Sequence, residues 1–578
     1  MGERWRNPRF WFAPAIAAIY LALALPLLRS HGVTYDAPAL YYAGDRTLFF
    51  LTHPRTPGAL DFSLKEDPPA FRSFFSRDDE WVDPMRYPVF PTLVAAATSA
   101  VVRDGLGWLD PAAAHQLGLV LLDALALAFF AHHAVRFLGV WAGVAAALSL
   151  ALFPCAFGHS FNNPKDWPAA MFYGVAVLAA GDGFLNARPR ALIAAGVYGG
   201  LSLASKLNGV FAFVTLAAWL PVAYFTCLRR MPKEARAALG SAAVRASVIA
   251  VLIFFISWPW LWSGTLVGVA ERLGRYLSFM AGYGVGQRNT WSVQPLACVL
   301  FMTPPAILAA ACAGALSWLP PSTVRERLRL LLVGCWLVLP ILRSVVPRSN
   351  FYDANRHFIE YIPALCALAG LGFAWGIGLL GRVWTRLPGR LGGRRARTVA
   401  TGVLCAASAG SVLWALLAYA PFETTYFNSF IGGLGGAQRR ALFKPPPRAD
   451  QRSAGTEGDY WYQSLRQAFI EANRRFPIPA DIVLCSAPVV LGEANRTGQP
   501  LRPIGVYNAR APLAPLVWVS PREGACSWRT VRQLETERPV LLRVERGGGL
   551  IYELLGPRSA IPLRPVSPEN GYTAPPGT

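Results

Sequence analysis

Charged residues are scarce in this sequence, and acids are the scarcer sign. Only 15% of its 578 residues are Asp, Glu, Lys or Arg, whereas a soluble domain carries about a quarter. The mean hydropathy is +0.34. The 33 acids stand against 55 bases, which gives a formal net charge of +22. The low charge content excludes an ordinary soluble domain and indicates many membrane-spanning helices.

Metal-binding cysteine patterns and internal repeats are also lacking. None of the nine cysteines forms a CxxC pair or a Cys/His spacing typical of a metal site. Seven of them lie in or beside apolar runs, where we expect small core residues. The other two, Cys485 and Cys526, lie in a polar tail, and a compartment outside the cytoplasm would permit a disulfide between them.

Apolar runs long enough to span a membrane recur along the chain. They cover residues 10–28, 114–135, 139–157, 167–186, 244–262, 295–318, 328–346, 357–380 and 399–419, and 191–226 is long enough for two short helices. The first run lacks a small-residue cleavage site, so we interpret it as a retained helix and not as a signal peptide. One further run, 88–102, is short and begins with Pro88.

The basic residues predict the orientation of these runs. They cluster in short loops between the runs, which is typical of topology signals in membrane proteins, and we do not expect nucleic acid as a partner. All basic clusters fall on the side of the basic N-terminus if 88–102 does not span. We therefore predict about eleven spanning helices, a re-entrant or surface helix at 88–102, and a cytoplasmic N-terminus in the inner (plasma) membrane.

Two regions follow from this topology. Residues 1–420 form the transmembrane domain, with a large first outer loop at 29–112. We expect this loop to lie on the membrane through its aromatic residues Phe71, Phe74, Phe75 and Trp81. Residues 421–578 form a soluble extracytoplasmic domain, whose strand-like runs at 482–484, 515–519 and 540–542 and helical run near 460–475 predict a small α/β module. The predicted fold class is an α-helical polytopic membrane protein with a small C-terminal α/β domain.

Polar residues gather at the predicted outer boundary of the apolar runs. They are Tyr35 and Asp36; Asn163, Lys165 and Asp166; Lys206; Tyr352, Arg356 and His357; and a loop with Tyr283, Gln287 and Trp291. A single Asp at such a boundary is most often a helix cap or a solvated loop acid. Two carboxylates that converge with several bases suit a phosphate-bearing lipid, because charge at this depth is costly unless it is paired or used. An enzyme and a transporter both fit this pattern.

The same residues carry a resemblance to a known family. The chain resembles the membrane glycosyltransferases of the GT-C fold, specifically bacterial relatives of the dolichyl-phosphate-mannose–protein mannosyltransferases (family 39) and of the aminoarabinose transferase of lipid A. The resembling segments are Tyr35-Asp36, residues 86–91, 163–168 and 199–209, Trp291 with Pro295, Arg356-His357 with Pro363, residues 421–437, and Asp459-Tyr460-Trp461.

This resemblance implies that a sugar passes from a polyprenyl-phosphate donor to an acceptor protein, lipid or glycan on the outer face. It implies that Asp36 is the general base or orients the acceptor, and that Asp166 is the second catalytic acid. The donor phosphate would be bound by Lys206, Arg356, His357 and Lys165, and Tyr35, Asn163, Tyr283, Gln287, Trp291 and Tyr352 would line the substrate loops.

The chain departs from the family pattern beside Asp36. Many members carry Asp-Glu after the first helix, whereas this sequence has Asp36-Ala37, so Asp166 is the preferred second carboxylate and Asp45 the next choice. No cofactor is clearly implied, although Asp36 and Asp166 with phosphate oxygens could hold Mg²⁺ or Mn²⁺. The alternative, a flippase or other transporter of lipid-linked saccharide, is less favoured because the chain shows no paired halves and its acids lie at one boundary.

Overall fold

The computed structural model describes most of the chain, and most of what it describes is helical. The described residues are 11–61, 66–75, 87–283, 286, 289–319, 322–349, 351, 353–384, 394–440, 442, 458–459, 461–475, 480–485, 487, 489–496, 501–505, 516–521 and 528–556.

Every predicted apolar run is helical. The helices are α1 (Phe12–Leu27), α4 (Pro111–Leu138), α5 (Val140–Ala151) followed by α6 (Pro154–Asn162), α7 (Asp166–Leu185), α8 (Pro189–Ser205), α9 (Val210–Thr226), α10 (Lys233–Ile256), α13 (Gln294–Phe301) followed by α14 (Pro305–Leu316), α15 (Val324–Val345), α16 (Tyr361–Trp384) and α17 (Arg394–Tyr419).

The helix lengths confirm a multi-pass membrane protein. Within the described residues, seven helices are long and apolar enough to cross a membrane, or up to nine if each of two bent pairs is one span. The α5–α6 pair bends by 59° and the α13–α14 pair by 110°. The predicted total of eleven also counts α1 and α8, which have 16 and 17 residues, fewer than the roughly 20 of a typical span.

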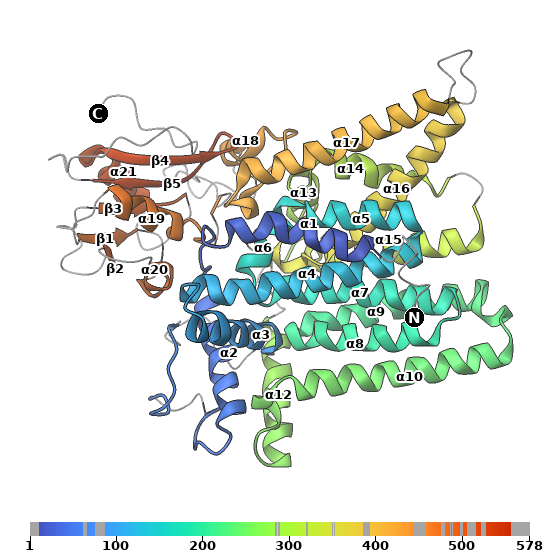
Figure 1. The fold of residues 1–578 in the computed structure, drawn as a ribbon, viewed down its shortest axis with the longest axis horizontal. Helices are drawn as coiled ribbons and strands as arrows, with labels where there is room; N and C mark the ends of the chain where they lie inside the picture. Colours follow the sequence, from blue (N-terminus) through green and yellow to red (C-terminus); the bar gives the residue numbers. More distant parts are fainter. Residues whose placement is uncertain are drawn as a thin grey trace.

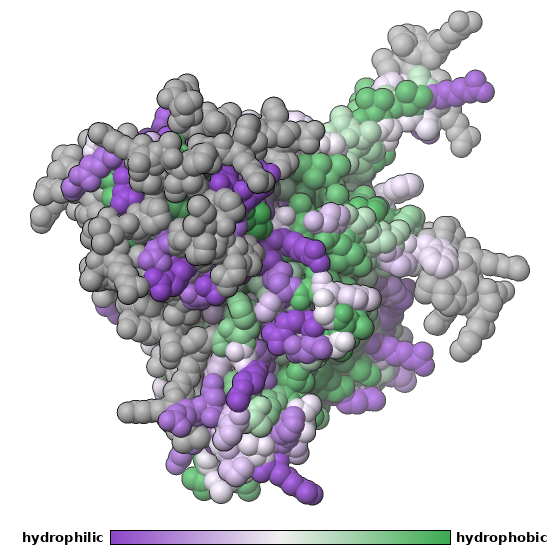
Figure 2. All heavy atoms as spheres, turned by 60° about the vertical axis from the view of Figure 1, so that its left-hand side comes forward, coloured by the Kyte–Doolittle hydropathy of each residue, from purple (hydrophilic) through white to green (hydrophobic). Residues whose placement is uncertain are grey.

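The long helices lie side by side, with α7 at the centre (Figure 1). The apolar stretch of α7 is 94% buried, whereas those of α10 and α17 are 17% and 11% buried. A helix that is apolar all round and fully covered is a core helix, and one that exposes its apolar side chains suits contact with lipid. Figure 2 shows the hydrophobic surface over these helices and hydrophilic patches beyond one end of them.

Two helices that the sequence analysis did not predict run across the bundle at that end. They are α2 (Ala37–Thr52) and α12 (Leu266–Tyr283), which Figure 1 shows at a steep angle to α8 and α10. The ambiguous run 88–102 forms α3 (Phe90–Ser99) and a π-helical turn over residues 100–105, packed against α2 and α4. It is not among the helices that qualify as spans.

Aromatic side chains of the first outer loop pack differently from expectation. The sequence suggested that Phe71, Phe74, Phe75 and Trp81 lie on the membrane. Phe71 and Phe75 are instead buried, because Phe71 packs edge-on against Tyr42 of α2 and Phe75 against Tyr41. Phe74 is exposed, and Trp81 lies outside the described residues.

The C-terminal region forms a small α/β unit, as predicted. Its five strands are β1 (Ala480–Leu484), β2 (Leu501–Gly505), β3 (Leu516–Val519), β4 (Val540–Arg546) and β5 (Gly549–Leu555), in the order β2-β1-β3-β5-β4. The pairs β1–β2 and β1–β3 are parallel, and β3–β5 and β4–β5 are antiparallel. Its helices are α19 (Leu465–Arg475), α20 (Val489–Asn495) and α21 (Trp528–Glu537), and the short η8 (Glu423–Thr425) and α18 (Gly433–Arg440) connect it to α17.

The two tail cysteines were predicted to pair. Cys485, directly after β1, is disulfide-bonded in the structure. Cys526 lies outside the described residues, so the pairing of these two cysteines stays a prediction. The other seven cysteines are free. The boundary of the two domains at residue 420 likewise stays a prediction.

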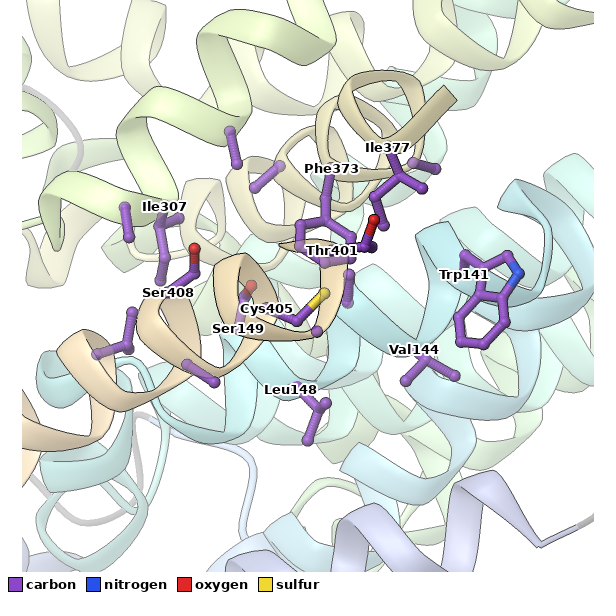
Figure 3. Close-up of a pocket in the computed structure, with 18 of the residues that line it drawn as sticks. Trp141, Val144, Leu148, Ser149, Ile307, Phe373, Ile377, Thr401, Cys405 and Ser408 are labelled. Atoms are coloured by element: carbon purple, nitrogen blue, oxygen red, sulfur yellow. The ribbon is translucent and has the colours of Figure 1, made fainter. Parts of the chain in front are cut away.

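A cavity of about 730 Å³ opens between α5, α14, α16 and α17. Its lining is largely apolar, with Leu148 of α5, Ile307 of α14, Phe373 of α16 and Cys405 of α17 around it (Figure 3). None of the predicted site residues lines it. The chemistry therefore has to be sought elsewhere, among the charged side chains at the ends of the helices.

Candidate active site

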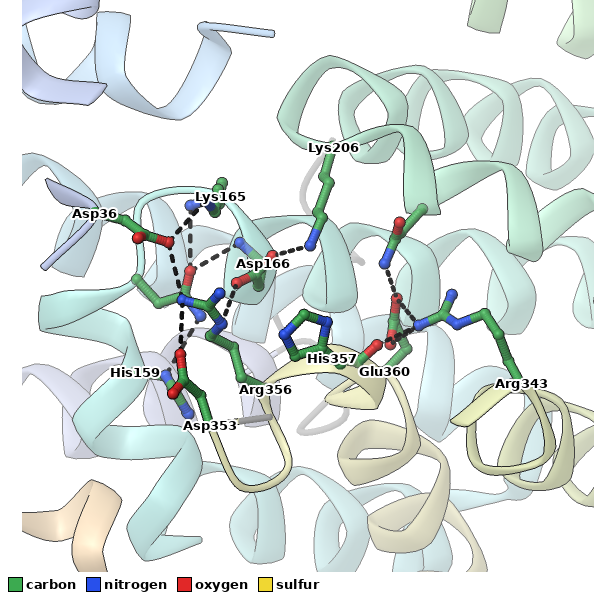
Figure 4. Close-up of polar contacts among 12 residues, drawn as sticks. Asp36, His159, Lys165, Asp166, Lys206, Arg343, Asp353, Arg356, His357 and Glu360 are labelled. Atoms are coloured by element: carbon green, nitrogen blue, oxygen red, sulfur yellow. Dashed lines mark hydrogen bonds and ion pairs between the residues drawn. The ribbon is translucent and has the colours of Figure 1, made fainter. Parts of the chain in front are cut away.

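Five charged side chains from four segments meet at one end of the helical bundle (Figure 4). Asp36 directly precedes α2, Lys165 and Asp166 lie at the start of α7, Lys206 directly follows α8, and Arg356 begins the short helix η6 (Arg356–Phe358). Each residue lies at an element boundary, where a charged side chain avoids the cost of the apolar helix interior. All five were predicted from the sequence, and the structure brings them together.

The carboxylate of Asp36 binds two bases. Its Oδ2 accepts hydrogen bonds from Lys165 Nζ at 2.8 Å and from Arg356 Nη1 at 2.9 Å. Asp36 occupies the N-cap position of α2, yet its side chain makes no capping hydrogen bond. Asp110, by contrast, caps α4 by accepting from the backbone of Ala112 and Ala113. The geometry thus rejects the interpretation of Asp36 as an ordinary helix cap.

The second carboxylate, Asp166, completes the arrangement. Its Oδ1 accepts a hydrogen bond from Lys206 Nζ, and its Oδ2 lies 3.8 Å from Arg356 Nε. The guanidinium of Arg356 therefore bridges the two carboxylates. Asn163 holds the backbone of this segment in place, because its Oδ1 accepts from Asp166 N at 2.8 Å and from Lys165 N at 3.4 Å.

Burial makes this cluster unusual. None of these five charged residues is more than 7% exposed. Removing so many charges from water costs several kcal/mol per ion unless they compensate one another. A chain that required only stability would have no need of such a cluster, so its position marks a site where charge is used.

Charge pairing sets the protonation states outside the spanning helices. Burial alone would raise the pKa of Asp36, but Lys165 and Arg356 outweigh it and lower the pKa to about 2. Burial would also lower the pKa of Lys165, but Asp36 and its other neighbours raise it above the ordinary value of a lysine. Both groups are charged at neutral pH.

The protonation state of His357 differs from that of Asp36 and Lys165. Burial, with Arg356 and Lys206 nearby, lowers its pKa far below the usual value, so the imidazole is neutral at physiological pH. A neutral His357 can donate or accept a hydrogen bond to a phosphate oxygen but adds no positive charge. Its predicted contribution to phosphate binding is therefore weaker than that of the lysines and Arg356.

A second polar group lies beside His357 (Figure 4). Arg343 Nη2 donates to both carboxylate oxygens of Glu360 at 3.2 Å and to the backbone oxygen of His357 at 2.5 Å. Asn208 Nδ2 donates to Glu360 Oε1 at 3.2 Å. The sequence analysis did not single out Arg343 or Glu360, whose signal was a charge in each of two apolar runs.

Three more residues contact the site, although the sequence analysis assigned them no role. The ring of Tyr87 lies 4.1 Å from Lys165 Nζ, and Asp353 Oδ2 lies 3.5 Å from Arg356 Nη1. The ring of Trp461 lies 4.7 Å from the guanidinium carbon of Arg356. Tyr87 and Trp461 occur in the motifs at 86–91 and 459–461, so a signal for them existed in the resemblance.

The remaining predicted residues are placed less centrally. Tyr35 is partly exposed, and its ring lies 6.3 Å from that of Tyr462. Trp291 is 65% exposed and has no contact with the cluster in the part of the chain that the structure describes. Gln287 and Tyr352 lie outside the described residues, as does the side chain of Tyr283.

The side chains of the site do not by themselves form a metal-binding site. Within the described residues, no group of three or more His, Cys, Asp or Glu side chains is arranged to hold a metal ion. The oxygens of Asp36 and Asp166 that bind bases face Lys165, Lys206 and Arg356. The Mg²⁺ or Mn²⁺ site, which would also need phosphate oxygens of the donor, stays a prediction.

Comparisons with known proteins bear on the fold. No family model and no curated protein matches the chain. Similar solved structures include ArnT from Cupriavidus metallidurans in the apo state (15% identity, 94% of this chain and 98% of that chain covered, TM-score 0.45) and the same protein bound to undecaprenyl phosphate (15%, 93% and 97%, TM-score 0.48). The archaeal oligosaccharyltransferase AglB from Archaeoglobus fulgidus, in complex with an inhibitory peptide and a dolichol-phosphate, is also similar (12%, 86% and 64%, TM-score 0.47). At these scores we base the function on the site geometry alone.

Proposed function

We propose that this protein is a membrane glycosyltransferase that moves a sugar from a polyprenyl-phosphate donor to an acceptor on the outer face of the membrane. The observation that carries the proposal is the buried convergence of Asp36 and Asp166 with Lys165, Lys206 and Arg356 at one end of apolar helices. Such a site suits an amphipathic substrate, because the bases can bind the charged head group of the substrate while its apolar tail stays in the lipid.

The bases provide the electrostatic part of the reaction. In the transfer, the bond between the sugar C1 and the phosphate oxygen breaks, and the electron pair stays on that oxygen. Lys165, Lys206 and Arg356 are positioned to neutralise this developing charge, Arg356 by two parallel hydrogen bonds and the lysines as point charges. Preorganised cations in a site of low dielectric lower the barrier more than the same groups would in water.

The carboxylate of Asp36 provides the base. The acceptor oxygen forms the new bond to C1 and its proton passes to Asp36. A donor phosphate would draw Lys165 and Arg356 away from Asp36 Oδ2, to which both are now bonded. The pKa of Asp36 then rises from its present low value, so donor binding itself would make Asp36 a stronger base. Asp166 keeps Lys206 and Arg356 in place from the other side.

The predicted orientation of the helices supports a reaction outside the cytoplasm. The basic clusters predict a cytoplasmic N-terminus, and α7 begins at the site and ends at the side where Arg136 and Arg188 lie. The active site is then on the outer face of the inner (plasma) membrane, where lipid-linked sugars and envelope acceptors meet.

The experiment is a transfer assay with the purified protein in nanodiscs. Radiolabelled polyprenyl-phosphate sugars are offered with membrane extracts that contain protein, lipid and glycan acceptors, with EDTA or with added Mg²⁺ or Mn²⁺. We expect label to move from the lipid donor to an acceptor with the wild type and not with Asp36→Asn. Full activity of Asp36→Asn would remove the proposed base, and translocation of the intact donor without cleavage would identify a transporter instead.

A further inference from the structure

The C-terminal tail reaches into the active site through one buried aromatic residue. Trp461 is 2% exposed, and its ring faces the guanidinium of Arg356 with 4.7 Å between the ring centre and Cζ. The ring of His159 in α6 packs edge-on against Trp461 at 5.5 Å. The backbone oxygen of Trp461 accepts a hydrogen bond from Tyr35 N at 3.2 Å. One residue of the tail thus contacts Arg356 and the residue before Asp36.

We propose that Trp461 is a positioning residue of the active site, which holds the Arg356 guanidinium in the plane and orientation that binds the donor phosphate. The inference rests on the proposed function and adds that the tail is part of the phosphate site. A guanidinium over an indole face is held by cation–π attraction and loses rotamer freedom before the substrate arrives. An arginine that is already oriented binds phosphate better, because it has less entropy to lose.

The local structure fixes Trp461 in turn. Asp459 accepts hydrogen bonds from the backbone of Gln463 at 2.8 Å and of Ser464 at 2.7 Å, which shapes the turn that leads into α19. Tyr462 has a positive φ of 61°, and its ring packs edge-on against Trp518 of β3 at 6.1 Å. The turn is therefore tied to the tail's sheet on one side and presents Trp461 on the other.

Further contacts bind the same turn to the segment that carries Asp36. Gln463 accepts from Asn162 Nδ2 at 2.5 Å and donates to Thr424 Oγ1 at 2.5 Å. Gln467 Nε2 donates to Ser30 O at 3.2 Å, and Arg466 Nε to Arg29 O at 2.8 Å. The turn and the first residues of α19 thus contact both segments that carry the carboxylates, directly before Asn163 and before Asp36.

The next residues of the Asp36 segment are bound by other parts of the tail. Asn495 of α20 accepts from Val33 N at 2.6 Å and donates to Val33 O at 2.8 Å. The buried pair His31 Nε2 and Glu423 Oε2 are 2.8 Å apart. A Cβ at Gly32 would lie only 2.1 Å from the backbone oxygen of Gln463. Contacts this close require that the tail and residues 31–36 keep a fixed position relative to one another.

The test compares Trp461→Ala and Trp461→Phe with a matched control, Ile551→Ala. Ile551 is fully buried in β5, so its truncation destabilises the tail without removing a contact to Arg356. The probe is undecaprenyl phosphate, titrated into each variant in nanodiscs, and kcat and KM for the labelled donor are measured in parallel. We expect Trp461→Ala to weaken binding about tenfold, Trp461→Phe to recover most of it, and Ile551→Ala to bind as the wild type does.

A double-mutant comparison separates positioning from general destabilisation. In an Arg356→Gln background Trp461 has no guanidinium to orient, so Trp461→Ala should weaken binding no further. An equal loss in both backgrounds, or wild-type binding by Trp461→Ala, would overturn the positioning role. If the wild type binds undecaprenyl phosphate but transfers no sugar, the proposed function fails and the binding comparison still decides the role of Trp461. If the wild type does not bind it, both fail.

Discussion

The helix α7 carries a carboxylate with basic partners at each of its ends. At the start, Asp166 binds Lys206 and faces Arg356, whose side chains are 8% and 5% exposed. Near the other end, Asp182 binds Arg136 and Arg188, whose side chains are 39% and 45% exposed. The two carboxylates are about 24 Å apart along the helix axis, at 1.5 Å per residue.

The difference lies in how the partners are assembled. The Asp182 cluster is closed by Asn186 and Arg188, from the same helix end, and by Arg136 from the end of α4, and its arginines keep contact with water. Such a cluster fixes a helix end, and the charges of its two arginines stay solvated although Asp182 itself is buried. The Asp166 cluster draws on segments from residue 36 to residue 356 and excludes water from its bases. We infer that the Asp182 cluster anchors the end of α7, whereas the Asp166 cluster performs chemistry.

The strongest test of this contrast is Asp36→Asn. The amide keeps the shape of the side chain but cannot take the acceptor proton, so we expect kcat to fall by about a thousandfold. Asp182→Asn is the matched control at the other end of the bundle and should keep nearly full turnover. The rates are measured by the transfer assay in nanodiscs, and equal losses in the two variants would remove the contrast.

Arg356→Gln should have the next largest effect. Loss of the guanidinium removes the bridge between the carboxylates and a donor to the leaving phosphate, and we expect kcat/KM to fall about a hundredfold. Arg188→Gln is the corresponding change at the other end, and we expect it to leave kcat/KM unchanged. A drop for Arg188→Gln of similar size would mean that both clusters serve catalysis.

The variants Asp166→Asn and Asp182→Asn compare the two ends of α7 within one helix. Because Asp166 positions Lys206 and Arg356, we expect a fall in turnover of about tenfold to a hundredfold with a higher KM for the donor. Asp182→Asn should instead lower the midpoint of thermal unfolding and leave KM unchanged. Steady-state kinetics and thermal unfolding of the two variants give the answer, and a raised donor KM for Asp182→Asn would contradict the assignment.

The smallest expected effect is a pH dependence of stability. The pKa of Asp36 is lowered from 3.8 to about 2, so its charge favours the folded form above about pH 4. This contribution is lost as the pH falls from about 4 to 2, because the carboxylate is then protonated in both states. Unfolding of the wild type and of Asp36→Asn should therefore differ at pH 6 and converge towards pH 2. A difference that stays constant would show that pairing does not stabilise Asp36.

Much of this site could be predicted from the sequence, for a physical reason. An apolar run long enough to span a membrane places the charges that flank it at a known depth. Asp36, Asp166, Lys206 and Arg356 each adjoin such a run, and the basic loops predict which side they share. The resemblance to GT-C glycosyltransferases rested on the same residues.

The rest depends on packing between distant segments. Trp461 and Asp353 meet Arg356 only because the tail and the loop before η6 fold onto it. The helices α2 and α12 carry a mixed set of residues and lack a long apolar run, so hydropathy did not indicate them. Phe71 and Phe75 were expected at the membrane for their aromatic character alone, but their rings instead pack against Tyr42 and Tyr41 of α2.

The contact between Gly32 and Gln463 has a consequence for the order in which the protein is made. Asn495 and Val33, bonded beside it, are 462 residues apart in the chain. During synthesis, α1 and Asp36 leave the ribosome long before the turn that packs on them. The spanning helices can insert as they emerge, whereas the active site is finished only by the last quarter of the polypeptide. A chain cut short before the tail would therefore occupy the membrane without a complete site.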